Sequence, residues 1–215
     1  MTTWLEAQSH EKSFWHRFLT DELRCRNRDM AVGFRMCESW LCLSLLGYVW
    51  IVERNLSTEN PLRGKILDVG CGPISVLEHA VGCSVVAIDP ALADYHRDTP
   101  ELVVLGQSDN VEYRSTTIQE VQETDFDIVW CVNVLDHTDN WQSIVDNFAR
   151  VLKPEGLLLL STDVRTVVDQ WHIATYTEYQ LGMELAQHFD TDFVQNSPGR
   201  PEHYRMNYRM RRRHG

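Results

Sequence analysis

Residues 65–73 read Lys-Ile-Leu-Asp-Val-Gly-Cys-Gly-Pro, an apolar run that leads directly into a turn with two glycines. Gly70 and Gly72 carry no Cβ, so the turn is able to adopt positive φ and let backbone N–H groups approach a ligand closely. Apolar residues at helical spacing follow over 74–81, and a second apolar run covers 84–88. The pattern predicts a strand-helix-strand unit whose turn binds a nucleotide-like ligand.

Asp89 ends the second predicted strand, about twenty residues beyond the first, where a carboxylate accepts from both hydroxyls of a ribose. The alternative for Asp89 is a helix N-cap. A dinucleotide-binding oxidoreductase shares this layout, but its fingerprint needs a third glycine where this chain has Ser75. The sequence therefore favours another class of nucleotide-binding protein.

The segment 68–73 resembles the first motif of the class I S-adenosylmethionine-dependent methyltransferases. Three further segments resemble that family in the same order: 89–90 its ribose-binding acid, 126–133 its fourth strand, and 150–159 its junction of helix and fifth strand. Together they span most of residues 64–163. The resemblance implies S-adenosyl-L-methionine as the cofactor, with S-adenosyl-L-homocysteine as its product.

Alternating strands and helices along the chain predict a parallel sheet. The predicted strands are 65–69, 84–88, 110–114, 126–132 and 156–162, and the predicted helices are 74–81, 91–97, 138–151 and 176–188. Over 204–210, tyrosine and methionine alternate with arginine and asparagine, which favours a final strand with one buried face over a nucleic-acid arm. We expect an α/β fold: a Rossmann-like, doubly wound, mostly parallel seven-stranded sheet with an antiparallel C-terminal strand.

Two apolar-striped helices, at 9–25 and 30–53, are expected before the nucleotide fold. They predict an N-terminal helical cap over residues 1–60, with the S-adenosylmethionine-binding methyltransferase domain over 61–215, in one compact unit. At 215 residues the chain has the size of a single α/β domain. The most apolar window, 40–52, is shorter than the about 20 residues that a bilayer span needs, so no span is expected.

The net charge of −11 hides an asymmetry, because six arginines and one acid lie between Arg200 and the end. The rest of the chain is therefore strongly acidic, which argues against a protein that mainly holds nucleic acid. The six cysteines form no C-x-x-C pair, and the chain does not begin with a signal-peptide pattern. These features predict a cytoplasmic location and no metal site.

The cofactor-binding candidates follow the strands, since ligands of an open parallel sheet bind at the carboxyl ends of its strands. Asp68 is expected to stabilise the glycine turn or to meet the cofactor's ammonium group. Thr116 or Thr117 is expected at the adenine edge, although either could cap a helix. On the resemblance, the candidates are Asp68, Gly70, Cys71, Gly72, Pro73, Asp89, Pro90, Thr116, Thr117, Asn133 and Val134.

The loop after the fourth strand is where the resemblance places methyl donor and acceptor together. A sulfonium is already activated, so alignment and the exclusion of water carry most of the reaction. For a hydroxyl acceptor, His137 is the best-placed base, with packing as its alternative role. Asp136 would orient it or cap the next helix. His172, with Trp171 and Tyr176, is expected to face the acceptor or to pack, so the catalytic candidates are His137, Asp136 and His172.

The acceptor is a small molecule on this interpretation. Enzymes that methylate nucleobase nitrogens carry Asn/Asp-Pro-Pro-Tyr/Phe where this chain has Asn-Val-Leu-Asp at 133–136, so that reaction is disfavoured. Residues 135–139 resemble methyltransferases of small metabolites, quinone or lipid precursors and sugars, and 88–95 resemble members found among glycan-modifying genes. A sugar or glycan-precursor hydroxyl is the first expectation. The alternatives are a non-catalytic binding or regulatory protein of the same fold, and a methyltransferase of nucleic acid or protein.

Overall fold

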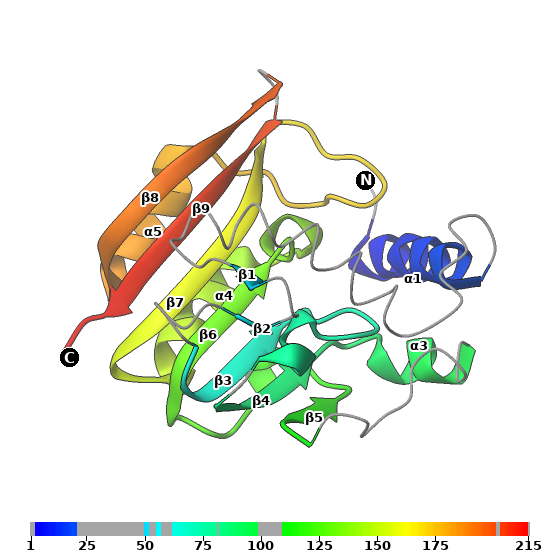
Figure 1. Ribbon diagram of the computed structural model, residues 1–215. Helices are drawn as coiled ribbons and strands as arrows, with labels where there is room; N and C mark the ends of the chain where they lie inside the picture. The colour runs from blue at the N-terminus through cyan, green and yellow to red at the C-terminus, as the bar shows by residue number, and fades with distance from the viewer. Residues whose placement is uncertain are drawn as a thin grey trace.

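A computed structural model describes residues 3–20, 50–51, 55–56, 62–80, 82–98, 109–200 and 203–214. Its main feature is a seven-stranded sheet in the order β5-β4-β3-β6-β7-β9-β8 (Figure 1). The strands are β3 (Gly64–Val69), β4 (Cys83–Ile88), β5 (Val111–Arg114), β6 (Phe126–Val132), β7 (Leu152–Arg165), β8 (Phe189–Arg200) and β9 (His203–Arg212). The first five pair in parallel, and β9 pairs antiparallel with both β7 and β8. The predicted fold class is therefore confirmed.

Helices and short 3-10 turns connect these strands. They are α1 (Trp4–Thr20), η1 (Val76–His79), α3 (Leu92–Asp98), η2 (Ile118–Glu120), η3 (Leu135–His137), α4 (Trp141–Val151) and α5 (Glu178–His188). Asn140 begins α4, because its side chain accepts from the Ser143 N–H, and Thr177 begins α5 through a capping box with Gln180.

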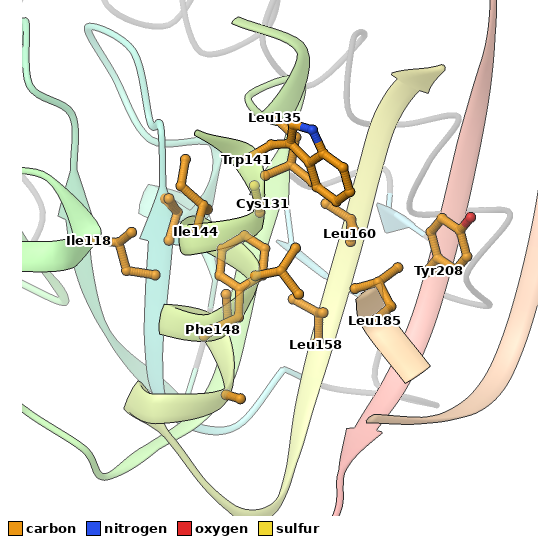
Figure 2. Close-up of a cluster of buried hydrophobic side chains, with 14 of the residues drawn as sticks. Ile118, Cys131, Leu135, Trp141, Ile144, Phe148, Leu158, Leu160, Leu185 and Tyr208 are labelled. Carbon is orange, nitrogen blue, oxygen red and sulfur yellow. The ribbon is translucent and has the colours of Figure 1, made fainter. Parts of the chain in front are cut away.

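The core divides into two apolar clusters because successive strand residues face opposite sides of the sheet. On β3, Leu67 belongs to the cluster beneath α4 and α5, whereas Ile66 belongs to the cluster that includes residues of η1 and α3. Figure 2 shows Phe148 and Ile144 of α4 among the side chains of the larger cluster. Both faces of the parallel sheet are therefore covered.

The helical part of the segment between β3 and β4 is shorter than the sequence predicts. The apolar spacing predicts a helix over 74–81, but only the 3-10 turn η1 forms there. Ser75 starts this turn by accepting from the Leu77 N–H, and Gly82 has φ +80° just before β4 begins. The chain thus turns back into the sheet before an α-helix of full length is able to form.

The predicted N-terminal helices are only partly testable. The first, expected at 9–25, is observed as α1, which begins earlier at Trp4. The second, expected at 30–53, is wrong at its end, because Trp50–Ile51 form β1 and pair antiparallel with β2 (Asn55–Leu56). Its remainder lies outside the described residues.

The final strand forms where the alternation over 204–210 predicts it, as part of β9. Met206, Tyr208 and Met210 on its apolar face are buried, but Asn207 on the other face is buried as well. Arg213 follows β9 and is exposed, yet its backbone N–H donates to the His188 carbonyl and its guanidinium to the Ala186 carbonyl. A cation at the final carbonyls of α5 also complements the helix dipole.

The strand order fixes where a ligand binds. The chain runs outward from β3 through β4 to β5, then returns to the other side of β3 with β6. Ligands of an open α/β sheet bind at the carboxyl ends of the strands where this reversal occurs. The loops that follow β3, β4 and β6 therefore meet at one place.

Replacing Phe148 tests the packing of α4 on the sheet. Phe148 is 0% exposed, so Phe148→Ala should lower the free energy of unfolding by about 3–5 kcal/mol. Tyr179→Ala on α5 is the matched control, because that side chain is 74% exposed and its loss should cost no more than about 0.5 kcal/mol. Urea unfolding followed by circular dichroism measures both; equal losses would contradict the packing described here.

Candidate active site

The glycine turn after β3 is held against two neighbouring segments. Gly70 has φ +70°, and its N–H donates to the Ile88 carbonyl at 2.9 Å. A Cβ on Gly70 would lie 2.3 Å from Cγ2 of Val134, closer than packed atoms approach. Only glycine therefore fits this position, where β3, the end of β4 and the loop after β6 converge.

Asp89 is placed between the glycine turn and α3. Its Oδ2 accepts from the Gly72 N–H at 3.0 Å and its Oδ1 from the Ala91 N–H at 2.8 Å. The side chain also lines a cavity, so it combines the turn-capping role with the position expected of a ribose acceptor. A carboxylate oxygen is able to accept more than one hydrogen bond, so these two contacts are compatible with a ligand hydroxyl at Asp89.

Asp68 lies behind the glycine turn. It is buried, and its Oδ2 accepts from the Ser75 hydroxyl at 2.5 Å, the same hydroxyl that caps η1. It lines neither of the two cavities described below. The geometry thus gives Asp68 a turn-stabilising contact, whereas a contact with the cofactor's ammonium has no direct support.

Two adjoining cavities occupy the carboxyl ends of the strands. The first has a volume of about 310 Å³ and is lined by residues of α1, the glycine turn, the end of β4, the loop after β6 and the loop after β7. The second, of about 280 Å³, lies toward η2 and the start of α4. Gly70, Pro90 and Val134 line both, so the cavities meet at the glycine turn.

The second cavity has a threonine wall whose hydroxyls are already engaged. Thr116 and Thr117 both line it, and both donate their hydroxyls to the Glu120 carboxylate, at 2.9 and 3.0 Å. The Thr117 backbone N–H also donates to Glu120, and these hydrogen bonds lower the pKa of that carboxyl. Thr117 therefore caps η2 in a capping box with Glu120, which is the alternative role given for it above.

A hydrogen-bonded chain leads from Arg205 of β9 to Asn133 and His137, two residues that line the first cavity. The Arg205 guanidinium donates to Asp163 at 2.8 Å and to Oδ1 of Asn133 at 2.5 Å. Nδ2 of Asn133 lies 3.3 Å from Nε2 of His137, and Nδ1 of His137 lies 3.1 Å from the Trp171 carbonyl. Both ring nitrogens of His137 thus face groups of the protein.

His172 lies beside His137, with ring centroids 4.6 Å apart, and it also lines the first cavity. Its Nδ1 lies 2.8 and 2.9 Å from the two oxygens of Asp169. Burial acts to raise the pKa of Asp169, but the hydrogen bonds that it accepts from His172 and the Trp171 N–H outweigh this and lower the pKa to about 2. Asp169 is therefore ionised at neutral pH.

Asp136 is a buried carboxylate beside His172. It is completely buried, and neither carboxylate oxygen has a hydrogen-bond partner among the described residues. Its Oδ2 lies 3.6 Å from Nε of Arg165 and 3.7 Å from Nε2 of His172. It does not cap α4, which starts at Trp141 behind Asn140, so that alternative for Asp136 is wrong.

Asp136, His137 and His172 each offer a metal-ligating atom, and these atoms lie within 4.8 Å of one another. The sequence predicted no metal site, although these three residues are its three catalytic candidates. His172 comes from the loop after β7, more than thirty positions beyond the other two, so no short ligand spacing announces it.

The predicted site residues divide into those that line a cavity and those that lie behind one. The cavity walls include Gly70, Gly72, Asp89, Pro90, Thr116, Thr117, Asn133, Val134, His137 and His172. Asp68, Cys71, Pro73 and Asp136 are buried outside these walls. Tyr176, expected as an acceptor contact, is a core residue whose hydroxyl lies 2.6 Å from Thr162 Oγ1.

Several wall and support residues were not anticipated. α1 contributes Gln8, Glu11, Phe14 and Trp15 to the first cavity, and α3 contributes Tyr95. Arg205 was assigned only to the polar face of a strand, but its pairing with Asp163 across β7 and β9 brings it to Asn133. The period-two pattern places Arg205 on a face, and only the strand order reveals its neighbour.

Comparison with known families shows the class of protein to which this chain belongs. The family model described as a methyltransferase domain matches residues 49–212. The chain belongs to this family of methyltransferase domains, and the predicted class, the S-adenosylmethionine-dependent methyltransferases, is confirmed with its cofactor. The described residues include no helix long and apolar enough to cross a membrane.

Similar proteins differ in what they act on. A ubiquinone biosynthesis O-methyltransferase from Bradyrhizobium diazoefficiens is 34% identical over 119 residues, 51% of this chain and 44% of that protein. The chain thus spans less than half the length of that relative. The 1,6-didemethyltoxoflavin-N1-methyltransferase from Burkholderia thailandensis, solved with its substrate and S-adenosylhomocysteine, is similar over 100% of this chain and 92% of its own, with 19% identity and a TM-score of 0.56.

The fold alone does not decide the reaction. The [4+2]-cyclase SpnF is as similar in structure, with a TM-score of 0.58 and 16% identity over 86% of this chain and 96% of its own. Both structural likenesses show the fold. The chemistry of this chain has to be argued from its own side chains.

The position of Asp89 generates a prediction on cofactor affinity. Asp89→Ala removes the acceptor for the ribose hydroxyls and should weaken S-adenosylhomocysteine binding by roughly tenfold to a hundredfold, the equivalent of about 1.5–3 kcal/mol. Asp98→Ala, at the exposed end of α3, is the control and should leave binding unchanged. Calorimetry measures both, and NAD should not bind. A folded Asp89→Ala protein with the parent's affinity would remove Asp89 from the site.

Proposed function

We propose that this chain transfers the methyl group of S-adenosylmethionine to a hydroxyl of a small molecule that enters the first cavity. One observation carries the proposal: two histidines, His137 and His172, line the cavity that Gly70, Gly72 and Asp89 also line. A hydroxyl must lose its proton when it attacks the methyl group, and imidazole is the side chain that titrates nearest to neutral pH. Cofactor and proton acceptor would thus share one cavity.

The cofactor would extend across both cavities. Its ribose hydroxyls would reach Asp89, and its adenine would enter the second cavity beside Ile118 and the threonine wall. Its methionine end would follow the glycine turn toward Asn133, which carries φ +60° and also lines the first cavity. This placement directs the sulfonium methyl toward the histidines.

We further propose that α1 roofs the acceptor, in line with the expected cap over residues 1–60. Phe14 and Trp15 line the first cavity, and Lys12 ties α1 to α3 through an ion pair with Asp94 at 2.7 Å. A roof that excludes water favours methyl transfer, because the acceptor has to be aligned with the methyl–sulfur bond. The domain limits at residue 60 stay a prediction.

The walls favour an acceptor with a flat, largely apolar ring. Phe14, Trp15 and Trp171 provide aromatic surface around the histidines. Aromatic faces stack on planar rings, so a phenolic hydroxyl fits these walls best. The ubiquinone-related names of the curated relatives agree with this class. A sugar hydroxyl is the second candidate, because Gln8 and Glu11 offer the polar contacts that a sugar would need.

A labelled-methyl experiment tests the proposed function. Purified protein with methyl-labelled S-adenosylmethionine is offered phenols, catechols, sugar derivatives and amines, and the products are identified by mass spectrometry. We expect an O-methyl product, formed fastest from a ring-bearing hydroxyl. Methylated amines alone would contradict O-methylation. Binding of the cofactor without any labelled product, from the panel or from a cell extract, would favour a non-catalytic protein of this fold.

Phe14 tests the role of α1. Phe14→Ala removes aromatic surface from the acceptor side of the cavity and should raise the acceptor KM by roughly tenfold to a hundredfold, as expected for about 1.5–3 kcal/mol of lost apolar contact. The affinity for S-adenosylhomocysteine should change much less. Leu5→Ala is the matched control on the same helix, because Leu5 is 73% exposed. Equal losses of cofactor and acceptor affinity would contradict a roof that acts on the acceptor.

The remaining expectations concern location and partners. The cytoplasmic location and the expectation that nucleic acid is an unlikely partner stay predictions from composition.

A further inference from the structure

A buried carboxylate without hydrogen bonds needs a nearby positive charge, because an ion in a low-dielectric interior is costly unless it is compensated. Asp136 is such a group, with 0% of its surface exposed. The two nitrogens nearest to it, Nε of Arg165 and Nε2 of His172, lie just beyond hydrogen-bond reach, at 3.6 and 3.7 Å. Arg165 supplies one positive charge beside Asp136, and an imidazolium at His172 would supply a second.

The hydrogen-bonded chain through Asn133 fixes the proton of His137. Arginine is only a donor, so the atom of Asn133 that faces Arg205 must be its oxygen, and its amide nitrogen then faces His137. Nε2 of His137 accepts from that amide, which leaves the proton on Nδ1, where the Trp171 carbonyl accepts it. Nδ1 of His137 thus carries its proton, and its one basic lone pair, on Nε2, already accepts from Asn133, so none is free for a substrate proton.

The opposite holds for His172. The Asp169 carboxylate is only an acceptor, so Nδ1 of His172 carries the proton and Nε2 carries the lone pair. Among the described residues, Nε2 has no hydrogen-bond partner, and it is not one of the fully buried polar atoms. Since His172 lines the first cavity, Nε2 is accessible to a molecule bound there.

We propose that His172 is the catalytic base of the methyl transfer, with Asp169 and Asp136 as positioning residues; this inference rests on the proposed function. The acceptor oxygen forms a bond to the methyl carbon as the carbon–sulfur bond breaks, and that electron pair stays on sulfur to give S-adenosylhomocysteine. The hydroxyl proton passes to Nε2 of His172. Asp169 holds the ring in the required tautomer, and Asp136 stabilises the imidazolium.

The charges around His172 agree with this role. Asp169 faces it from the same loop, Asp136 and His137 from η3, and Arg165 of β7 lies against both carboxylates. From α1, Glu11 approaches the neighbouring His137 at 3.9 Å. Carboxylates outnumber guanidinium groups here, so the charge gained when His172 takes a proton is compensated on both sides of its ring.

Turnover of an acceptor whose O-methyl product has been identified separates the two histidines. His172→Gln should lower kcat by about 10²–10⁴-fold, the usual contribution of a general base, whereas His137→Gln should lower it by less than about 10²-fold. Asp169→Asn should also lower kcat, because an amide is able to donate as well as accept and no longer fixes the tautomer. The surface pair His188 and Asp146, 2.8 Å apart between α5 and α4, provides the matched controls His188→Gln and Asp146→Asn, which should retain full activity.

The pH profile distinguishes a positioning role of Asp136 from a structural one. The parent's rate should rise with pH, because only neutral imidazole accepts the proton. Asp136→Asn removes a negative charge beside His172 and keeps the shape of the side chain, so the imidazolium is less stable and the rate should rise at a lower pH than in the parent. An unchanged profile in a folded Asp136→Asn protein would overturn this part of the proposal.

The ring protons of the histidines supply a readout that does not depend on turnover. Nitrogen-15 spectra of the imidazole rings at alkaline pH should show both His137 and His172 protonated on Nδ1, with Nε2 of His172 free of a donor. A His172 ring protonated on Nε2 would overturn the assignment even if O-methylation is established. Absence of any O-methyl product with the expected ring protons would instead count against the proposed function.

The last test asks whether Asp136, His137 and His172 hold a metal ion, since their ligating atoms lie close enough together to do so. Dialysis against a chelator should leave turnover unchanged, because His172 acts with its lone pair free. Loss of activity on chelation and its recovery with Zn²⁺ or Mg²⁺ would overturn the proposal, since Nε2 of His172 would then be a metal ligand and not a base.

Discussion

The site depends on the absence of a side chain at Gly70. Its positive φ and its hydrogen bond to the Ile88 carbonyl bring the end of β3 against the end of β4, and Val134 fills the space where a Cβ would lie. Three segments far apart in the chain therefore converge on one backbone position. Asp89 then accepts from the Gly72 N–H, which keeps the turn open and its own carboxylate at the cavity wall. Cofactor recognition on this interpretation is a consequence of backbone geometry more than of any charged side chain.

The acceptor side follows a different principle, because it is organised by charge. Arg205 and Arg165 form ion pairs with three carboxylates, those of Asp136, Asp163 and Asp169. Arg205 orients Asn133, and through it determines the proton of His137. Asp169 determines the proton of His172 in the same way, with the opposite result for Nε2. Two adjacent imidazoles of the same chemical type thereby acquire different roles from their hydrogen-bond partners alone.

The sequence predicted what depends on local pattern and on the family motif. The strand-turn-strand unit, the position of Asp89 and the buried face of β9 follow from apolar periodicity and glycine placement. The sequence did not predict which histidine has a free lone pair, because the decisive contact joins Arg205 to Asn133 across two strands. It also did not predict the short η1 turn, which Ser75 starts and after which Gly82, with φ +80°, leads the chain back into β4.

A fold shared with a [4+2]-cyclase leaves the reaction open, so the distinction between methyl transfer and other chemistry must lie in the groups that face the cofactor. A bound sulfonium needs only an aligned nucleophile, and an enzyme of this fold with no proton acceptor would still bind it. Here the wall that faces the glycine turn carries His172, held by an ionised carboxylate and backed by the buried Asp136. Arg165 supplies one positive charge 3.6 Å from Asp136, and an imidazolium at His172 would add a second at 3.7 Å. Because that imidazolium forms only when His172 takes up a proton, the arrangement favours an acceptor that releases one, such as a hydroxyl.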